Sequence, residues 1–137
     1  MIANEHPTSR SAITGLHAVA VNVADQDRAI AFYVDMLGFE LRFDADLGGG
    51  FRWIEVAPPG ADTLIALTAA TPELPAGSDT GIRLTTLDAE MMHAAMVANG
   101  VDVDQLLRWP GIPPMFSFHD LDANTLYIMQ TPDETVE

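Results

Sequence analysis

The sequence contains no cysteine and no lysine. Without cysteine, disulfides, thiolate metal sites and a cysteine nucleophile are excluded, so a metal would have to bind His, Asp, Glu or water. All six basic residues are arginines, against 20 acidic residues, and the formal net charge is −14. Such a charge repels nucleic acid and anionic lipid surfaces, and it could attract cationic small molecules. The simpler interpretation is a solvated acidic surface.

Long apolar runs are also absent. No stretch reaches the length of a membrane span, and the first residues lack the basic-then-apolar pattern of a signal peptide. We therefore expect a soluble, cytoplasmic protein with a flexible polar tail at residues 1–12. Apolar residues make up 48% of the 137 residues, which is enough for the core of one domain.

Two stretches of the chain repeat one order of secondary structure. Each begins with a β-branched strand and continues through an Asp suited to cap a helix, an apolar stripe of helical period and a helix-ending glycine. The caps are Asp25 and Asp88, and Met91, Met92 and Met96 are expected in the core of the second helix. The expected strands are 16–23, 39–43, 51–56, 64–68, 81–86, 101–107, 115–118 and 125–130.

This repetition predicts an α+β fold. The first βαβββ module covers 13–70 and the second 80–130, with a linker at 71–79 that holds two prolines and a glycine, and a C-terminal tail at 131–137. One module is too small to close a core. Two modules side by side are expected to form one curved mixed sheet with the helices outside.

Three motifs carry a family resemblance. The runs VAD at 23–25, AIAFY at 29–33 and LGF at 37–39 resemble the first-helix signature of the vicinal oxygen chelate superfamily. The run FHDLDAN at 118–124 is close to that family's F-x-D-P-D-G-N turn, with Leu121 in place of Pro and Ala123 in place of Gly. The segment 51–60 resembles the central hairpin of many members. The resemblance covers 13–130 and relates the chain to glyoxalase I, extradiol dioxygenases and bleomycin-resistance proteins.

The resemblance also bears on metal binding. Metal-dependent relatives place one ligand, usually His or Glu, on each of four strands. The corresponding positions here are Ala18, Ala66, Gly81 and Tyr127, and none is a strong metal ligand. A shift of one residue would replace Gly81 by Thr80, which is no better. His17 adjoins Ala18, but it shares strand parity with Val19 and is expected to face the helix. We therefore expect no metal or other cofactor. Glyoxalase isomerisation, extradiol ring cleavage and fosfomycin opening would then lack the metal ion that polarises the substrate oxygens.

Strand parity selects the residues of a candidate site. Trp53 and Glu55 alternate with the aliphatic pair Ile54 and Val56, so we expect Trp53 and Glu55 to point into the cavity. Glu55 could oppose a ligand cation, pair with Arg83, or act as a base if burial raised its pKa. The candidate ligand-binding residues are Asn22, Trp53, Glu55, Arg83, Tyr127 and His119. Aromatic walls with a few polar groups are typical of small-molecule sites.

Two classes of function follow from the resemblance. The first is a binding protein that holds a small organic molecule, similar to the metal-free bleomycin-resistance members, whose dimers hold ligand in grooves. The second is an enzyme, either a metal-dependent lyase, isomerase or dioxygenase with rearranged ligands, or a metal-free acid–base catalyst using Glu55, His119 or Tyr127. The missing metal ligands favour binding, and a homodimer is expected. An accessory domain without ligand is a third interpretation.

Overall fold

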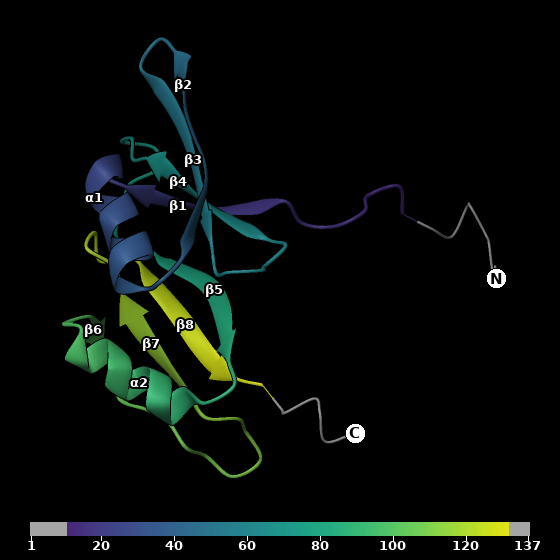
Figure 1. Ribbon diagram of the computed structural model, residues 1–137, viewed down its shortest axis with the longest axis vertical. Coiled ribbons are helices and arrows are strands. Elements are labelled where there is room, and N and C mark those ends of the chain that lie inside the picture. Colours follow the sequence, from purple (N-terminus) through teal and green to yellow (C-terminus); the bar gives the residue numbers. More distant parts are fainter. Residues whose placement is uncertain (1–10, 132–137) are drawn as a thin grey trace.

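A computed structural model describes residues 11–131, so most of the two expected tails lies outside the described residues. Residues 11–131 form eight strands and two α-helices, the first of which continues as a π-helical segment (Figure 1). The first half contains β1 (Ala18–Val23), α1 (Gln26–Ile30), η2 (Ala31–Met36), β2 (Glu40–Gly48), β3 (Phe51–Ala57) and β4 (Leu64–Ala69). The second half contains β5 (Asp79–Thr86), α2 (Ala89–Ala98), β6 (Asp102–Val103), β7 (Met115–His119) and β8 (Thr125–Gln130). This element order confirms the α+β class and the repeated βαβββ pattern.

The strands form two four-stranded mixed sheets of equal topology. The first sheet has the order β1-β4-β3-β2 and the second has the order β5-β8-β7-β6. In each sheet the first and last strands of the unit pair in parallel, and the other neighbours are antiparallel. Both helices lie on the left in Figure 1, against the sheets. Within residues 11–131 no strand pairing joins one sheet to the other, so β1 and β5 each leave one edge open.

The two helices begin and end in the same way. The Asp25 carboxylate accepts a hydrogen bond from the backbone N–H of Arg28 (3.1 Å), and Asp88 accepts one from Met91 (3.0 Å). These are the N-caps that the sequence predicts, and each satisfies a free donor of the first turn. Gly38 (φ +80°) and Gly100 (φ +81°) follow the helices in the left-handed region that glycine adopts at little cost.

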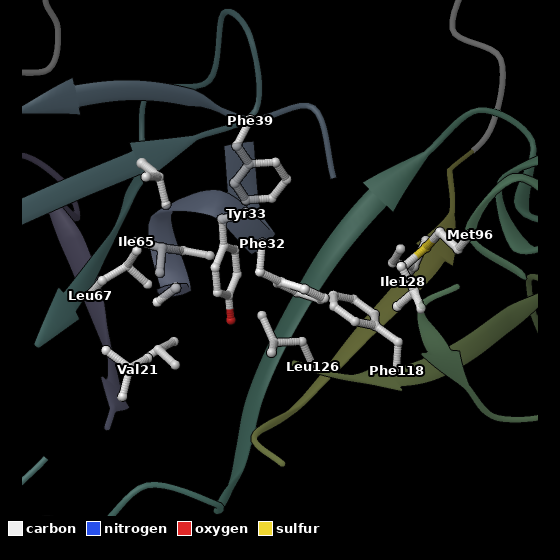
Figure 2. Packing of buried hydrophobic residues seen from close by; sticks show 14 of the residues in the cluster. Val21, Phe32, Tyr33, Phe39, Ile65, Leu67, Met96, Phe118, Leu126 and Ile128 are labelled. Carbon is white, nitrogen blue, oxygen red and sulfur yellow. The ribbon is translucent and has the colours of Figure 1, made fainter. Parts of the chain in front are cut away.

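One hydrophobic core spans both units. The rings of Phe32 and Tyr33 are buried beside the first sheet, and in Figure 2 Phe32 also lies toward Leu126 and Phe118 of the second sheet. Phe32 and Tyr33 meet edge-to-face, with 5.2 Å between ring centroids. The first helix therefore packs its own sheet against the second unit through side chains.

A buried polar joint also connects the units. The Tyr33 hydroxyl donates to Asp120 Oδ2 (2.9 Å), and Asn124 Nδ2 donates to the same oxygen (3.0 Å) and to the Asn22 carbonyl (2.9 Å). Asn124 Oδ1 accepts from the backbone N–H groups of Gly77 and Ser78. Burial, followed by the nearby charge of Asp120, raises the pKa of Tyr33, so its hydroxyl remains a donor. The turn of the family motif thus holds the first helix, β1 and the linker together.

Two local expectations are wrong. The strand expected at 101–107 is reduced to β6, and Leu107 only bridges to Met115, because the following segment is rich in proline and turns away. Met91 is 64% exposed, so the apolar stripe of α2 is narrower than expected, although Met96 is buried. Among the helices of residues 11–131, none is long and apolar enough to cross a membrane.

Candidate functional site

The first sheet has a helix-free side, which we call face A and define by Ala20, Asn22, Phe43, Trp53, Glu55, Ala66 and Thr68. Strand register places Ala20, Ala66, Glu55 and Phe43 in one row across all four strands. Asn22 and Thr68 stand opposite each other in the next row. On β3 the alternate residues Ile54 and Val56 are fully buried in the core, as the sequence alternation predicts. Trp53 and Glu55 therefore lie on face A.

Glu55 is the polar centre of face A. It is 7% exposed, and its Oε2 accepts hydrogen bonds from His17 Nε2 (2.8 Å) and Trp53 Nε1 (3.0 Å). Burial alone would raise the pKa of Glu55, but the bonds from Trp53 and His17 outweigh it and hold the pKa below its ordinary value. No side chain of residues 11–131 donates to Oε1. Glu55 is thus an ionised carboxylate with one free acceptor oxygen.

His17 does not point where its strand parity predicts. It lies just before β1, where the chain is not yet held in the regular pleat, and its ring turns to the side of Glu55. Its backbone carbonyl still accepts from Leu64 N–H (2.9 Å), which fixes the position of the residue. The side chain remains 74% exposed. His17 is therefore a residue of face A rather than of the helix layer.

Asn22 lies at the other end of face A. Its Oδ1 accepts from the Thr68 hydroxyl (2.7 Å), while its backbone carbonyl is held by Asn124 of the buried joint. A pocket of about 390 Å³ opens beside this pair, and Phe51 and Leu74 supply apolar walls. Its volume is in the range of small-molecule sites.

The second sheet has a corresponding helix-free side, face B, defined by Asp79, Arg83, Ser117, His119, Thr125 and Tyr127. Register aligns Arg83, Tyr127 and Ser117 in one row. The Arg83 guanidinium lies 4.4 Å from the centroid of the Tyr127 ring, a cation–π arrangement. The Tyr127 hydroxyl donates to Asp79 Oδ2 (2.7 Å), and this bond raises the pKa of Tyr127. The phenol consequently stays protonated.

His119 is engaged on both ring nitrogens. Its Nε2 lies 3.1 Å from Asp104 Oδ2, and its Nδ1 lies 3.1 Å from the Thr125 hydroxyl. Ser117 Oγ donates to the same oxygen of Asp104. His119 and Ser117 are thus held by Asp104, whereas Arg83 donates to the Gly81 carbonyl (2.8 Å).

The six candidate ligand-binding residues fall into two sets of three. Asn22, Trp53 and Glu55 lie on face A, and the remaining three, Arg83, Tyr127 and His119, lie on face B. In the described part of the chain, no hydrogen bond, ion pair or ring contact joins the two sets. Of the three roles considered for Glu55, pairing with Arg83 does not occur within the described residues, because His17 and Trp53 hold Glu55 while Arg83 stacks on Tyr127.

The positions that hold metal in relatives are unsuited to a metal here. Ala18 and Ala66 bring only methyl groups, and the Tyr127 hydroxyl already donates to Asp79. Among residues 11–131 no group of three or more His, Asp or Glu side chains is placed to hold a metal ion. The donor set therefore does not fit the metal of the metal-dependent relatives.

Comparison with known proteins establishes the family. A model of the Glyoxalase/Bleomycin resistance protein/Dioxygenase superfamily matches residues 15–133. The chain belongs to this superfamily. The match spans both sheets and both faces.

Solved members of the superfamily share the fold closely. TnmS3, described as an antibiotic binding protein from a Streptomyces species, is 35% identical, with a TM-score of 0.80 over 90% of this chain and 100% of TnmS3. A superfamily member from Sphaerobacter thermophilus is 32% identical, with a TM-score of 0.81 over 87% of this chain and 98% of its own. The uncharacterized protein YetH of Bacillus subtilis is 38% identical over 55 residues, which are 40% of this chain and 46% of YetH.

Sequence reasoning missed several residues of the two faces. Asp79 lies in the segment expected to be a linker, and register shifts separate it from Arg83 and separate Phe43 from Leu41, so alternation did not reveal either residue. His17 and Asp104 lie outside regular strands, where alternation gives no direction. Their contacts with Glu55 and His119 depend on the tertiary fold.

Proposed function

We propose that this superfamily member is a binding protein for a small organic molecule, which it holds on face A without a metal. The observation that carries the proposal is Glu55, a buried, ionised carboxylate with a free Oε1 beside the Trp53 indole. A buried acceptor gains most from a donor that a ligand supplies. Similarity to TnmS3, an antibiotic binding protein, supports the same class of function.

A cationic or hydrogen-bond-donating ligand suits this site. The net charge of −14 attracts cations over a distance, and Glu55 would bind a protonated nitrogen directly. The rings of Phe51 and Trp53, whose centroids are 6.1 Å apart, offer an aromatic surface next to that carboxylate. Stacking of a planar cation on such rings adds to its affinity.

The ligand site is completed by a second copy of the chain. Phe43 (44%), Phe51 (53%) and Leu47 (58%) are exposed on the β2–β3 hairpin, and this apolar surface needs cover. The open edges of β1 and β5 border a gap of about 860 Å³, lined in part by 58–65 and 80–85. A homodimer in which face A of one copy meets face B of the other would fill this gap. Arg83, Tyr127 and His119 would then join Glu55 in one site, and the protein would act in the cytoplasm.

A matched pair of dyes tests the ligand class. Proflavine is a planar cation at neutral pH, and acridine is a neutral molecule of similar shape. In a Trp109→Phe background, Trp53 is the remaining tryptophan and reports binding through its fluorescence. We expect proflavine to bind, and Glu55→Gln to raise its dissociation constant about tenfold because one charged hydrogen bond is lost. Acridine should bind only weakly to both proteins.

The control is Glu90→Gln, the same chemical change on α2, where Glu90 pairs with Arg108. It should leave proflavine binding unchanged. Equal binding of proflavine by the Glu55 variant would show that face A does not recognise a cation. If the Glu55 variant unfolds, as judged by circular dichroism, the carboxylate is structural and the proposal is lost.

A further inference from the structure

The hydrogen bonds of four polar side chains show which of them is free to act as a base. Tyr127 cannot serve as a base, since its hydroxyl donates to Asp79. His119 has both nitrogens engaged, by Asp104 and Thr125. Glu55 accepts two hydrogen bonds on one oxygen, and its lowered pKa makes it a weak base.

His17 differs from these three residues. A carboxylate only accepts hydrogen bonds, so the 2.8 Å contact with Glu55 places the ring proton on Nε2. The lone pair of Nδ1 is then available, because the side chain is 74% exposed and no group among the described residues bonds to Nδ1. A carboxylate behind an imidazole fixes its tautomer and stabilises the cation that forms when the ring takes a proton.

The surroundings of this pair suit a reaction on a small molecule. Glu55 is 7% exposed and is held in place by the Trp53 indole, while the His17 side chain is 74% exposed and open to a substrate. Phe43 and Ala66 flank Glu55 in the same strand row and provide an apolar floor. The base is thus exposed to a substrate and is oriented by a buried partner.

We propose that His17 and Glu55 form a metal-free general-base pair on face A, which removes a proton from an activated C–H bond of a small aromatic or carbonyl compound. His17 is the catalytic residue, and Glu55 is its positioning residue. The activity goes beyond ligand binding, because a pure binding protein needs no free basic nitrogen.

A nitrobenzisoxazole is a suitable probe, because its ring opening needs only a base. His17 Nδ1 takes the proton from the ring carbon, and the C–H electron pair becomes the third bond of a nitrile. The N–O bond breaks, and its electrons leave on the phenolate oxygen. The imidazolium then returns the proton to water, so no oxidant, reductant or second substrate is consumed.

The rate of phenolate release by the full chain is compared across variants. We expect His17→Gln and Glu55→Gln each to lower kcat/KM about tenfold or more, since positioned bases contribute at least this much. The double variant should be no slower than the singles, because the two residues act as one unit. His93→Gln should retain the full rate, since His93 lies on α2 and bonds to the Asp104 carbonyl (2.8 Å).

Three results would overturn the proposal. The first is a wild-type rate no higher than that of His17→Gln, and the second is an equal loss in His93→Gln. The third is a failure of added imidazole to restore the rate of His17→Ala, a test that still applies if one variant folds poorly.

Nitrogen-15 NMR separates positioning from a structural role of Glu55: the population of the Nε2–H tautomer of His17 should dominate in the wild type and fall in Glu55→Gln. An unchanged tautomer ratio would remove Glu55 from the proposal.

Discussion

Face A and face B share one strand topology, yet they present different chemistry. Face A centres on one buried carboxylate among aromatic and methyl groups, and Glu55 keeps a free oxygen there. On face B, Tyr127 bonds to Asp79 and lies under the Arg83 guanidinium, and His119 bonds to Asp104. The repeated fold therefore supplies two similar supports, while the side chains on them have diverged. Glu55 therefore keeps an acceptor oxygen that no side chain of residues 11–131 uses, whereas Tyr127 and His119 already have hydrogen-bond partners.

The largest expected effect comes from removing the joint that both faces share. Asp120→Ala leaves the Tyr33 hydroxyl and Asn124 Nδ2 without their common acceptor in a buried place. We expect the free energy of unfolding to fall by about 3 kcal/mol, measured by urea titration with circular dichroism.

Asp122→Ala is the matched control for the joint. Asp122 lies in the same turn, and only its backbone N–H bonds to Asp120 (2.9 Å). The variant should change stability by less than about 0.5 kcal/mol. Equal losses in the two variants would mean that the turn, and not the link between the units, sets the stability.

The next effect concerns dimerisation through the exposed apolar residue Phe43 of face A. If a second copy covers face A, Phe43→Asp should raise the dimer dissociation constant about tenfold or more, because it places a charge in an apolar contact. Leu121→Asp is the control, since Leu121 is 43% exposed and Phe43 is 44% exposed. Analytical ultracentrifugation over a range of protein concentrations measures the dimer dissociation constant of each variant. A dimer weakened equally by the two changes would place the contact elsewhere.

Acid stability distinguishes the carboxylate of face A from those of face B. The folded-state pKa of Glu55 lies below its unfolded value, so its contribution is present above the unfolded pKa. That contribution is lost as the pH falls through the lower, folded pKa. We expect the free energy of unfolding of the wild type to exceed that of Glu55→Gln by about 1–2 kcal/mol at pH 7. This difference should fade below about pH 4. A difference that is constant with pH would mean that ionised Glu55 does not stabilise the fold.

Regular elements were predictable from sequence because their signals are local. The caps Asp25 and Asp88 and the strand β8 match the structure, and alternation put Ile54 and Val56 in the core. Contacts that join distant segments gave no such signal. Asp120 reads only as a turn former in the sequence, whereas its partner Tyr33 lies 87 residues away in the chain.

The site was predictable only in part for the same reason. Strand parity gave the face of each strand residue, but it could not show that within residues 11–131 no hydrogen bond or ion pair joins the candidate residues of one face to those of the other. That outcome depends on how the first helix packs against the second sheet. His17 was assigned to the wrong side because parity applies only inside a strand, and β1 begins at Ala18.

The smallest expected effect concerns the turn that precedes the last strand of each unit. The first unit has Gly60 at φ +79°, whereas the second unit has Ala123 at φ +63°, where a Cβ is strained. We expect Ala123→Gly to stabilise the protein by about 1 kcal/mol, measured by the melting temperature and by urea titration. Ala95→Gly in the middle of α2 should do the opposite and destabilise it by about 0.5–1 kcal/mol. Destabilisation by both changes would show that Ala123 packs against the joint more favourably than its backbone is strained.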